Sequence, residues 1–85
     1  MTNVAKRIRR DILSYIHDHP GTDKLDILEK VCPDRQKTGF NIIKGLINDG
    51  LVSMEIIHDT DGPIRYVKFA LSLTAKGKLS MGEFA

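Results

Sequence analysis

The spacing of apolar residues changes at Gly50, and this change constrains the fold more strongly than any other feature of the sequence. Before Gly50, apolar residues recur every three or four positions, as they do along one face of a helix. After Gly50 they occupy every second position, as they do in a strand with one apolar face. The spacing therefore predicts helices in the first part of the chain and strands in the second.

Two helices are predicted before the first long turn. The first carries its apolar stripe over 4–16 and ends before Pro20, because proline disfavours a helical conformation in the residue that precedes it. The second covers 25–32, and either Asp23 or Asp26 can cap its amino end. The predicted core-facing residues are Val4, Ala5, Ile8, Ile12, Leu13 and Ile16 on the first helix and Leu25, Leu28 and Cys32 on the second.

A third helix is predicted over 35–49, between the turn at Pro33-Asp34 and Gly50. Asp34 can cap its amino end, and Gly50 stands where a helix commonly closes in the left-handed conformation. Gly39 and Gly45 each weaken a helix by about 1 kcal/mol relative to alanine, although a glycine also lets a neighbouring helix approach closely. The predicted core-facing residues are Phe40, Ile43, Leu46 and Ile47.

Two strands follow, and each is expected to present one apolar face. The segment 58–63 between them is dense in turn residues, which predicts an antiparallel hairpin. A short helical turn over 74–79, capped by Thr74, is expected after the second strand. The apolar faces are predicted to consist of Val52, Met54 and Ile56 in the first strand and Val67, Phe69, Leu71 and Leu73 in the second.

A chain of 85 residues has room for one compact core, so we expect a single domain over 1–85, with its core at about 4–79 and a short tail at 80–85. The one cysteine, Cys32, cannot form an internal disulfide and is predicted to be a small buried residue. No apolar stretch is long enough to cross a bilayer, and the charged start lacks a signal-peptide core. We therefore expect a cytoplasmic protein without a membrane partner.

The order of these elements predicts the fold class. The second and third helices are too short to be stable alone, so they must pack against the first helix and the hairpin. Three helices followed by an antiparallel hairpin form an α+β fold of the winged helix-turn-helix type.

Two sequence segments carry a resemblance to the winged helix-turn-helix superfamily. The segment 46–52 reads L-I-N-D-G-L-V and resembles the L-x-x-x-G-L-V that closes a recognition helix. The segment 72–77 resembles the L-T-x-x-G that follows the hairpin, or wing, in small bacterial and phage regulators. The resemblance covers about 4–79. It implies that the third helix enters the major groove of DNA, that the wing contacts an adjacent groove or the backbone, and that 22–25 supply a small first strand.

The third helix carries a candidate DNA-reading surface. Four residues at spacings i, i+4, i+7 and i+11 bear only ammonium and amide groups opposite the apolar stripe, namely Lys37, Asn41, Lys44 and Asn48. Asparagine and glutamine can pair with adenine, and lysine can contact guanine or phosphate. A solvated helix face would have the same polarity. With two wing residues added, the predicted DNA contacts are Gln36, Lys37, Thr38, Asn41, Lys44, Arg65 and Lys68.

The distribution of charge leaves a second function open. The net charge is only +2, and Asp59 and Asp61 make the tip of the wing acidic. Four bases near the start can clamp the DNA backbone, form only a solvated helix face, or pair with acids of the second helix in the same molecule or in a partner subunit. These bases are Lys6, Arg7, Arg9 and Arg10, and the acids are Asp23, Asp26 and Glu29. The leading hypothesis is a small transcriptional regulator that binds double-stranded DNA in a sequence-specific manner. The alternative is a winged-helix module that docks on a protein and does not bind DNA.

A homodimer is a further expectation, because one small module covers little DNA. The candidate contacts are the first helix or the residues Leu79, Met81 and Phe84.

Catalytic and metal chemistry lack a motif in this sequence. His17 and His19 do not share a helix face, and no further ligand lies at a metal-binding spacing. The fragment at 59–62 resembles the start of a calcium loop, but Ala70 stands where the loop needs its final glutamate. We therefore expect neither an enzyme nor a bound metal or cofactor.

Overall fold

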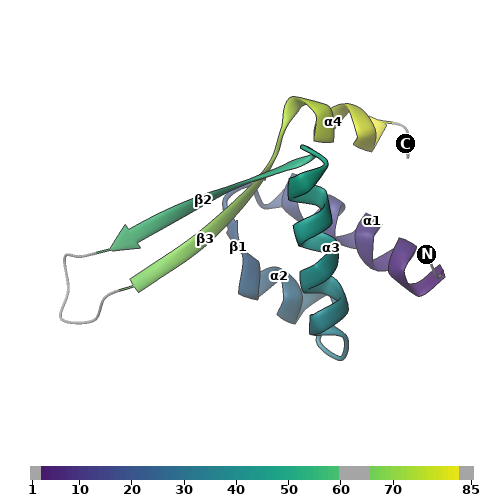
Figure 1. Ribbon diagram of the computed structural model, residues 1–85, viewed down its shortest axis with the longest axis horizontal. Helices are drawn as coiled ribbons and strands as arrows, with labels where there is room; N and C mark the ends of the chain where they lie inside the picture. The colour runs from purple at the N-terminus through teal and green to yellow at the C-terminus, as the bar shows by residue number, and fades with distance from the viewer. Residues whose placement is uncertain (1–2, 60–65, 83–85) are drawn as a thin grey trace.

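The computed structural model describes residues 3–59 and 66–82, with the side chains of 59, 66, 81 and 82 left out (Figure 1). Its elements in chain order are α1 (Asn3–Asp18), β1 (Thr22–Asp23), α2 (Lys24–Val31), α3 (Gln36–Asn48), β2 (Val52–Asp59), β3 (Tyr66–Leu73) and α4 (Ala75–Gly82). This order confirms the predicted α+β architecture of three helices followed by an antiparallel hairpin. None of the described helices combines the length and apolar content needed to cross a bilayer.

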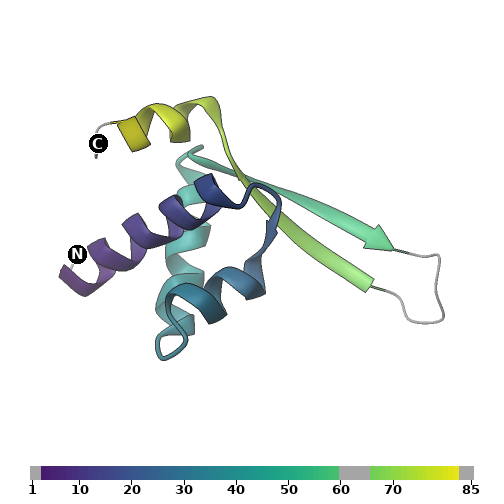
Figure 2. The ribbon, with the colours of Figure 1, turned by 180° about the vertical axis from the view of Figure 1, so that it is seen from behind.

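The three strands form one antiparallel sheet in the order β1-β3-β2. The β2–β3 hairpin, which we call the wing, pairs Val52 with Leu73 at its base and Ile57 with Lys68 further out. The small first strand expected from the resemblance is present, but it contains only Thr22 and Asp23, because α2 begins at Lys24. Figures 1 and 2 show the wing projecting away from the three packed helices.

The core lies where α1 contacts α2, α3 and β3. Each fully buried aliphatic side chain contributes about 1.5–3 kcal/mol to folding. The largest side chains with less than 2% exposure are Ile12, Leu13 and Ile16 of α1, Ile27 of α2, Ile43 and Leu46 of α3, and Leu71 of β3.

Two residues predicted to face the core on the second and third helices are exposed instead. Asp23 is the N-cap of α2, where its Oδ1 accepts a hydrogen bond of 2.8 Å from the Leu25 amide. Leu25 therefore lies in the first turn and is 64% exposed, while Ile27 and Leu28 face the core. Phe40 of α3 is 37% exposed, because it lies at the edge of the helix's buried stripe. Val4, at the start of α1, is likewise exposed.

The predicted apolar face of the wing is covered by the helices only in part. Val52 and Leu71 at its base are buried, whereas Met54, Ile56 and Val67 are exposed. The strand alternation was predicted correctly, but the wing extends past the helices, so only its base is covered (Figure 1).

The amino end of α3 is a further correction. The N-cap residue is Arg35, which makes no side-chain capping bond, so the prediction that Asp34 caps this helix is wrong.

The carboxy end of α3 closes in a Schellman motif. Gly50 has the predicted left-handed conformation, with φ +77°. Its amide donates to the Ile47 carbonyl at 3.1 Å, and the Leu51 amide donates to the Leu46 carbonyl at 3.0 Å. The Nζ of Lys76 in α4 donates a further bond of 3.0 Å to the carbonyl of Asp49.

The two segments that carried the family resemblance contact each other at this point. Thr74 caps α4 as predicted, since its Oγ1 accepts from the Gly77 amide at 3.0 Å. The same hydroxyl donates to the Gly50 carbonyl at 2.6 Å, and the Thr74 amide donates to the Leu51 carbonyl at 3.1 Å. Gly77 is buried so closely against Leu51 that a Cβ atom would overlap the Leu51 carbonyl oxygen. This close approach is a physical reason for glycine in the L-T-x-x-G segment.

We predict that Gly77→Ala destabilises the fold by about 1–3 kcal/mol, because the added methyl group would push α4 away from a backbone atom. Gly45→Ala is the matched control, since a Cβ there meets no atom within 4 Å. It is expected to raise stability by up to about 1 kcal/mol through helix propensity alone. Urea denaturation measures both changes, and equal stabilities for the two variants would contradict the assigned contact.

Candidate nucleic-acid interface

The exposed side of α3 carries the residues predicted to read DNA. Lys37, Asn41, Lys44 and Asn48 are all exposed, opposite Ile43 and Leu46, which are each 1% exposed. We call these four residues the polar face of α3. Because a helix turns once in 3.6 residues, they form one row along the helix. All hydrogen-bonding groups on this row belong to amides or ammonium ions.

The two other predicted contacts on α3 lie near its amino end. Gln36 is exposed, and its Nε2 donates a long hydrogen bond of 3.4 Å to the carbonyl of Pro33. Thr38 is half-buried and lies on the flank of α3 that faces α1. The structure therefore brings five of the seven predicted residues onto one helix.

Of the two predicted wing residues, Lys68 lies within the described part of the chain. Arg65 lies outside the described residues, as does the acidic tip at Asp61, and the Asp59 side chain is not described. Lys68 is half-buried on β3 and pairs across the hairpin with Ile57. Since successive side chains of a strand point to opposite faces, Lys68 lies on the face opposite Phe69.

A cluster of two aromatic rings and two lysines beside the polar face was missed by the sequence reasoning. The Nζ of Lys24 lies 4.6 Å from the ring centroids of both Phe40 and Phe69. The Nζ of Lys44 lies 5.7 Å from the Phe40 centroid. Such distances are those of cation–π contacts. No local signal could identify this cluster, because its members come from α2, α3 and β3.

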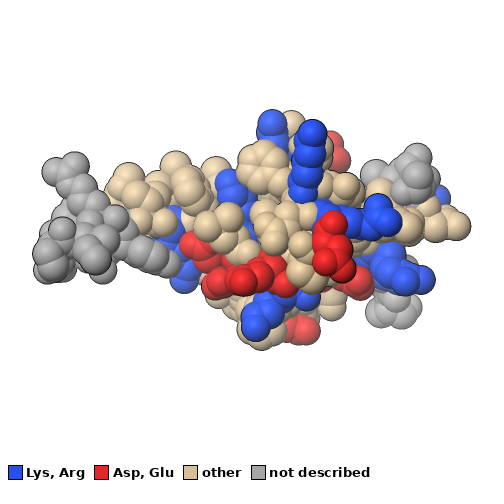
Figure 3. All heavy atoms as spheres, turned by 90° about the horizontal axis from the view of Figure 1, so that it is seen from below, with Lys and Arg blue, Asp and Glu red and all other residues tan. Residues whose placement is uncertain are grey.

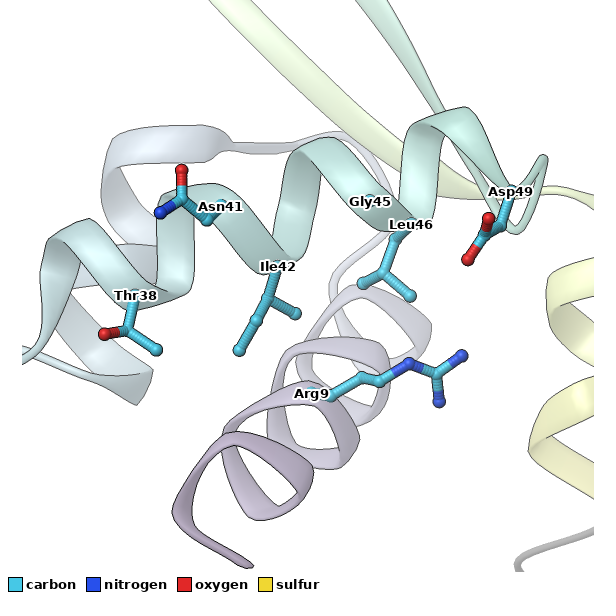
Figure 4. Close-up of a pocket in the computed structure, with 7 residues that line it drawn as sticks. All are labelled: Arg9, Thr38, Asn41, Ile42, Gly45, Leu46 and Asp49. Atoms are coloured by element: carbon cyan, nitrogen blue, oxygen red, sulfur yellow. The ribbon is translucent and has the colours of Figure 1, made fainter. Parts of the chain in front are cut away.

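The amino-terminal bases lie on α1, and three of them, Lys6, Arg7 and Arg10, are exposed. Arg9 is half-buried and lines a shallow groove of about 290 Å³ between α1 and α3 (Figure 4). The other lining residues are Thr38, Asn41, Ile42, Gly45, Leu46 and Asp49. Within 3–59 and 66–82, none of these four bases lies within ion-pair distance of a carboxylate. The alternative in which these bases pair with acids of α2 in the same molecule therefore does not hold.

The charge on the molecular surface is mixed rather than uniformly basic. Figure 3 shows acidic side chains gathered near the middle of the underside, with basic side chains around them. This pattern agrees with the small net charge of +2. Attraction to a polyanion must therefore come from local groups of bases and not from the whole surface.

Comparison with known proteins identifies the class of fold. No family model and no curated protein match the sequence. Among solved structures, a PadR-like transcription factor of Bacteroides fragilis matches with a TM-score of 0.74 and 27% identity, over 95% of this chain and 79% of that one. The F-93 protein of SSV1 matches with a TM-score of 0.67 and 28% identity, over 89% of this chain and 79% of that one.

A third match is PadR of Bacillus subtilis, whose structure was solved in complex with operator DNA. Its TM-score is 0.67 at 17% identity, and the match covers 89% of this chain and 45% of that one. At this identity the likeness shows the fold alone. Together these matches show that the chain has the winged helix-turn-helix fold of transcription regulators, as the sequence predicted. The matched PadR-like and PadR proteins are transcription regulators and not enzymes.

Cys32 is the one thiol of the chain, and its position is that of a core residue. It is 5% exposed, which confirms the prediction of a small buried residue, and this burial raises the pKa of its thiol. A thiol with a raised pKa is a poor nucleophile at neutral pH. The described residues also hold no group of three or more His, Cys, Asp or Glu side chains placed to bind a metal ion.

We predict that Cys32 reacts with a thiol reagent at least about tenfold more slowly in the native protein than in urea, because only the unfolded chain exposes a thiol of ordinary pKa. Absorbance of the released reagent measures the rate. Equal rates in native buffer and in urea would contradict the burial of Cys32.

Proposed function

We propose that this protein binds double-stranded DNA in a sequence-specific manner, placing α3 in the major groove, and that it regulates transcription. The observation that carries the proposal is the polar face of α3, which presents only amide and ammonium groups on the exposed side of a helix in a winged-helix fold. The operator complex of the Bacillus subtilis protein supports the same role for a chain of this fold.

The chemistry of the polar face suits base recognition. Asn41 lies near the middle of α3, and its side-chain amide can make two hydrogen bonds to adenine, in which the NH2 group donates to N7 and the carbonyl oxygen accepts from the N6 amino group. One such bidentate contact contributes about 1–3 kcal/mol of discrimination. Lys37 and Lys44 on either side can contact guanine or neutralise phosphates. Gln36 and Thr38 extend the proposed reading surface toward the amino end of α3.

The wing and α1 supply the remaining contacts in this proposal. Arg65 and Lys68 would neutralise backbone phosphates beside the groove that α3 enters. The exposed bases Lys6, Arg7 and Arg10 would do the same at the other side of the module. Such contacts hold the protein in register but carry no sequence information.

We also propose that the regulator acts as a homodimer. A single module of this size buries only about 600–1,000 Å² on DNA, and a second copy doubles the contact. Leu79 of α4 supports this proposal, because it is 75% exposed, the largest value among the exposed large hydrophobic residues of the described chain. The other candidate contacts, Met81 and Phe84, are not described at the level of their side chains.

Docking on a protein is the second candidate function, and the mixed charge of the underside favours it (Figure 3). A protein partner with its own mixture of charges would fit such a surface, whereas DNA offers only negative charge. The two functions differ in how affinity responds to salt. For DNA binding, the logarithm of the binding constant should fall steeply and linearly with the logarithm of the salt concentration.

We predict that the protein enriches a defined site from a library of randomised duplexes. On that site, Asn41→Ala should relax the preference at one base pair by about 1–3 kcal/mol, because it removes a bidentate amide. Lys37→Ala should weaken binding to all sequences and lower the salt dependence if it contacts phosphate. Fluorescence anisotropy at several salt concentrations measures each effect.

Lys78→Ala is the control for charge, because Lys78 is an exposed lysine of α4 that lies beside the end of α1 and the base of β3 and is not part of the polar face. It should leave affinity and base preference unchanged. If the wild-type protein binds no duplex even at low salt, or if the α3 variants bind as the wild type does, the proposed DNA function is wrong.

We predict that Leu79→Lys converts the homodimer to a monomer, because it places a charge in an apolar contact. Sedimentation equilibrium measures the mass of each variant. A wild-type protein that remains monomeric at high concentration would exclude the proposed dimer, and a dimer unaffected by Leu79→Lys would place its contact elsewhere than Leu79.

A further inference from the structure

Lys24 lies where α2 meets α3 and β3. It is the first residue of α2, it is half-buried, and its Nζ contacts Phe40 of α3 and Phe69 of β3 at 4.6 Å from each ring centroid. A lysine side chain on a surface normally loses rotamer entropy when a ligand fixes it. Here the two rings already restrict the ammonium group before any ligand is present.

The rings hold this ammonium group without neutralising it. A cation–π contact uses the quadrupole of the ring and leaves the full positive charge in place. Lys24 makes no ion pair with a carboxylate in the described part of the chain. Its neighbour Asp23 is engaged instead as the N-cap of α2. Lys24 is therefore a positioned cation that no carboxylate of the described residues neutralises.

A second unneutralised cation lies against the same aromatic cluster. The Nζ of Lys44 is 5.7 Å from the Phe40 centroid, and Lys44 belongs to the polar face of α3. Among the described residues it too has no carboxylate within ion-pair distance. Two ammonium groups within 5.7 Å of one ring centroid make the surroundings of Phe40 locally positive, which favours an anion there. Phe40, at 37% exposure, leaves this place open to solvent.

We propose that Lys24 and Lys44 form a phosphate-binding site around Phe40 that takes a single backbone phosphate of DNA, with Phe40 and Phe69 as positioning residues for Lys24. The inference rests on the proposed DNA-binding function and adds a contact to it. Lysine is suited to a phosphate because it is a compact point charge with three donors. The bound phosphate would fix α3 relative to the backbone, and the polar face would then read the bases.

The test uses the full chain and a fluorescent duplex of mixed sequence, about 30 base pairs long, because phosphate contacts also act in non-specific binding. Lys24→Met keeps an unbranched side chain that can pack on the rings while it removes the charge. We expect Lys24→Met and Lys44→Met each to weaken binding about three- to tenfold at 0.1 M salt. Lys30→Met, an exposed lysine on the same helix, is the matched control and should change nothing.

The salt dependence distinguishes one shared phosphate from two separate ones. For the double variant of Lys24 and Lys44, the slope of log K against log salt should fall by about 0.9, which corresponds to one phosphate. A fall of about 1.8 would mean two independent contacts and would overturn the shared site. Wild-type affinity for Lys24→Met would overturn it as well, while leaving the proposed DNA function intact.

The role of the rings has its own readout. Phe40→Leu should reduce the effect of Lys24→Met on DNA affinity, because a lysine without its ring is no longer held in place. A purely structural role for Phe40 would lower stability in urea but leave the effect of Lys24→Met unchanged, and that result would overturn the positioning role. A wild-type protein that binds no duplex at low salt would instead remove the proposed function and this site together.

Discussion

Three residues of α1, Ile12, Leu13 and Ile16, are completely buried, and the short helices α2 and α3 depend on this contact. With 8 and 13 residues, neither helix would be stable alone. Packing against α1 buries one stripe of α3 through Ile43 and Leu46. The opposite side must then face solvent, so the burial that stabilises the fold also creates the polar face.

The wing is held relative to α3 by a small set of hydrogen bonds to backbone carbonyls. Gly50 ends the helix, and Thr74 joins the turn after α3 to the start of α4 through both its amide and its hydroxyl. Gly77 allows α4 to approach Leu51 at the same point. Since two segments distant in the sequence share these bonds, the angle between α3 and the wing does not depend on side-chain packing alone. The proposed DNA contact requires such a fixed angle, because helix and wing must reach adjacent parts of one duplex.

Because the net charge is only +2, the proposed DNA binding depends on local cations such as the two lysines beside Phe40. A surface with mixed charge cannot attract DNA by its total potential, so binding must rest on a few well-placed cations. Lys24 and Lys44 have this character, because aromatic rings hold them and no described carboxylate neutralises them. The polar face and this cluster therefore have different proposed tasks: the first reads bases, and the second fixes the position of α3 on the backbone.

The sequence by itself determined the order of helices and strands, the closure of α3 at Gly50 and the cap at Thr74, because periodicity and capping are local properties of the chain. It also identified the polar face, which lies opposite a regular apolar stripe. The exposure of Leu25, Phe40 and Met54 was decided only by the tertiary structure. Periodicity says which residues share a face, but not how far a neighbouring element covers that face. The contact of Lys24 with Phe40 and Phe69 likewise exists only because three separate elements meet in space.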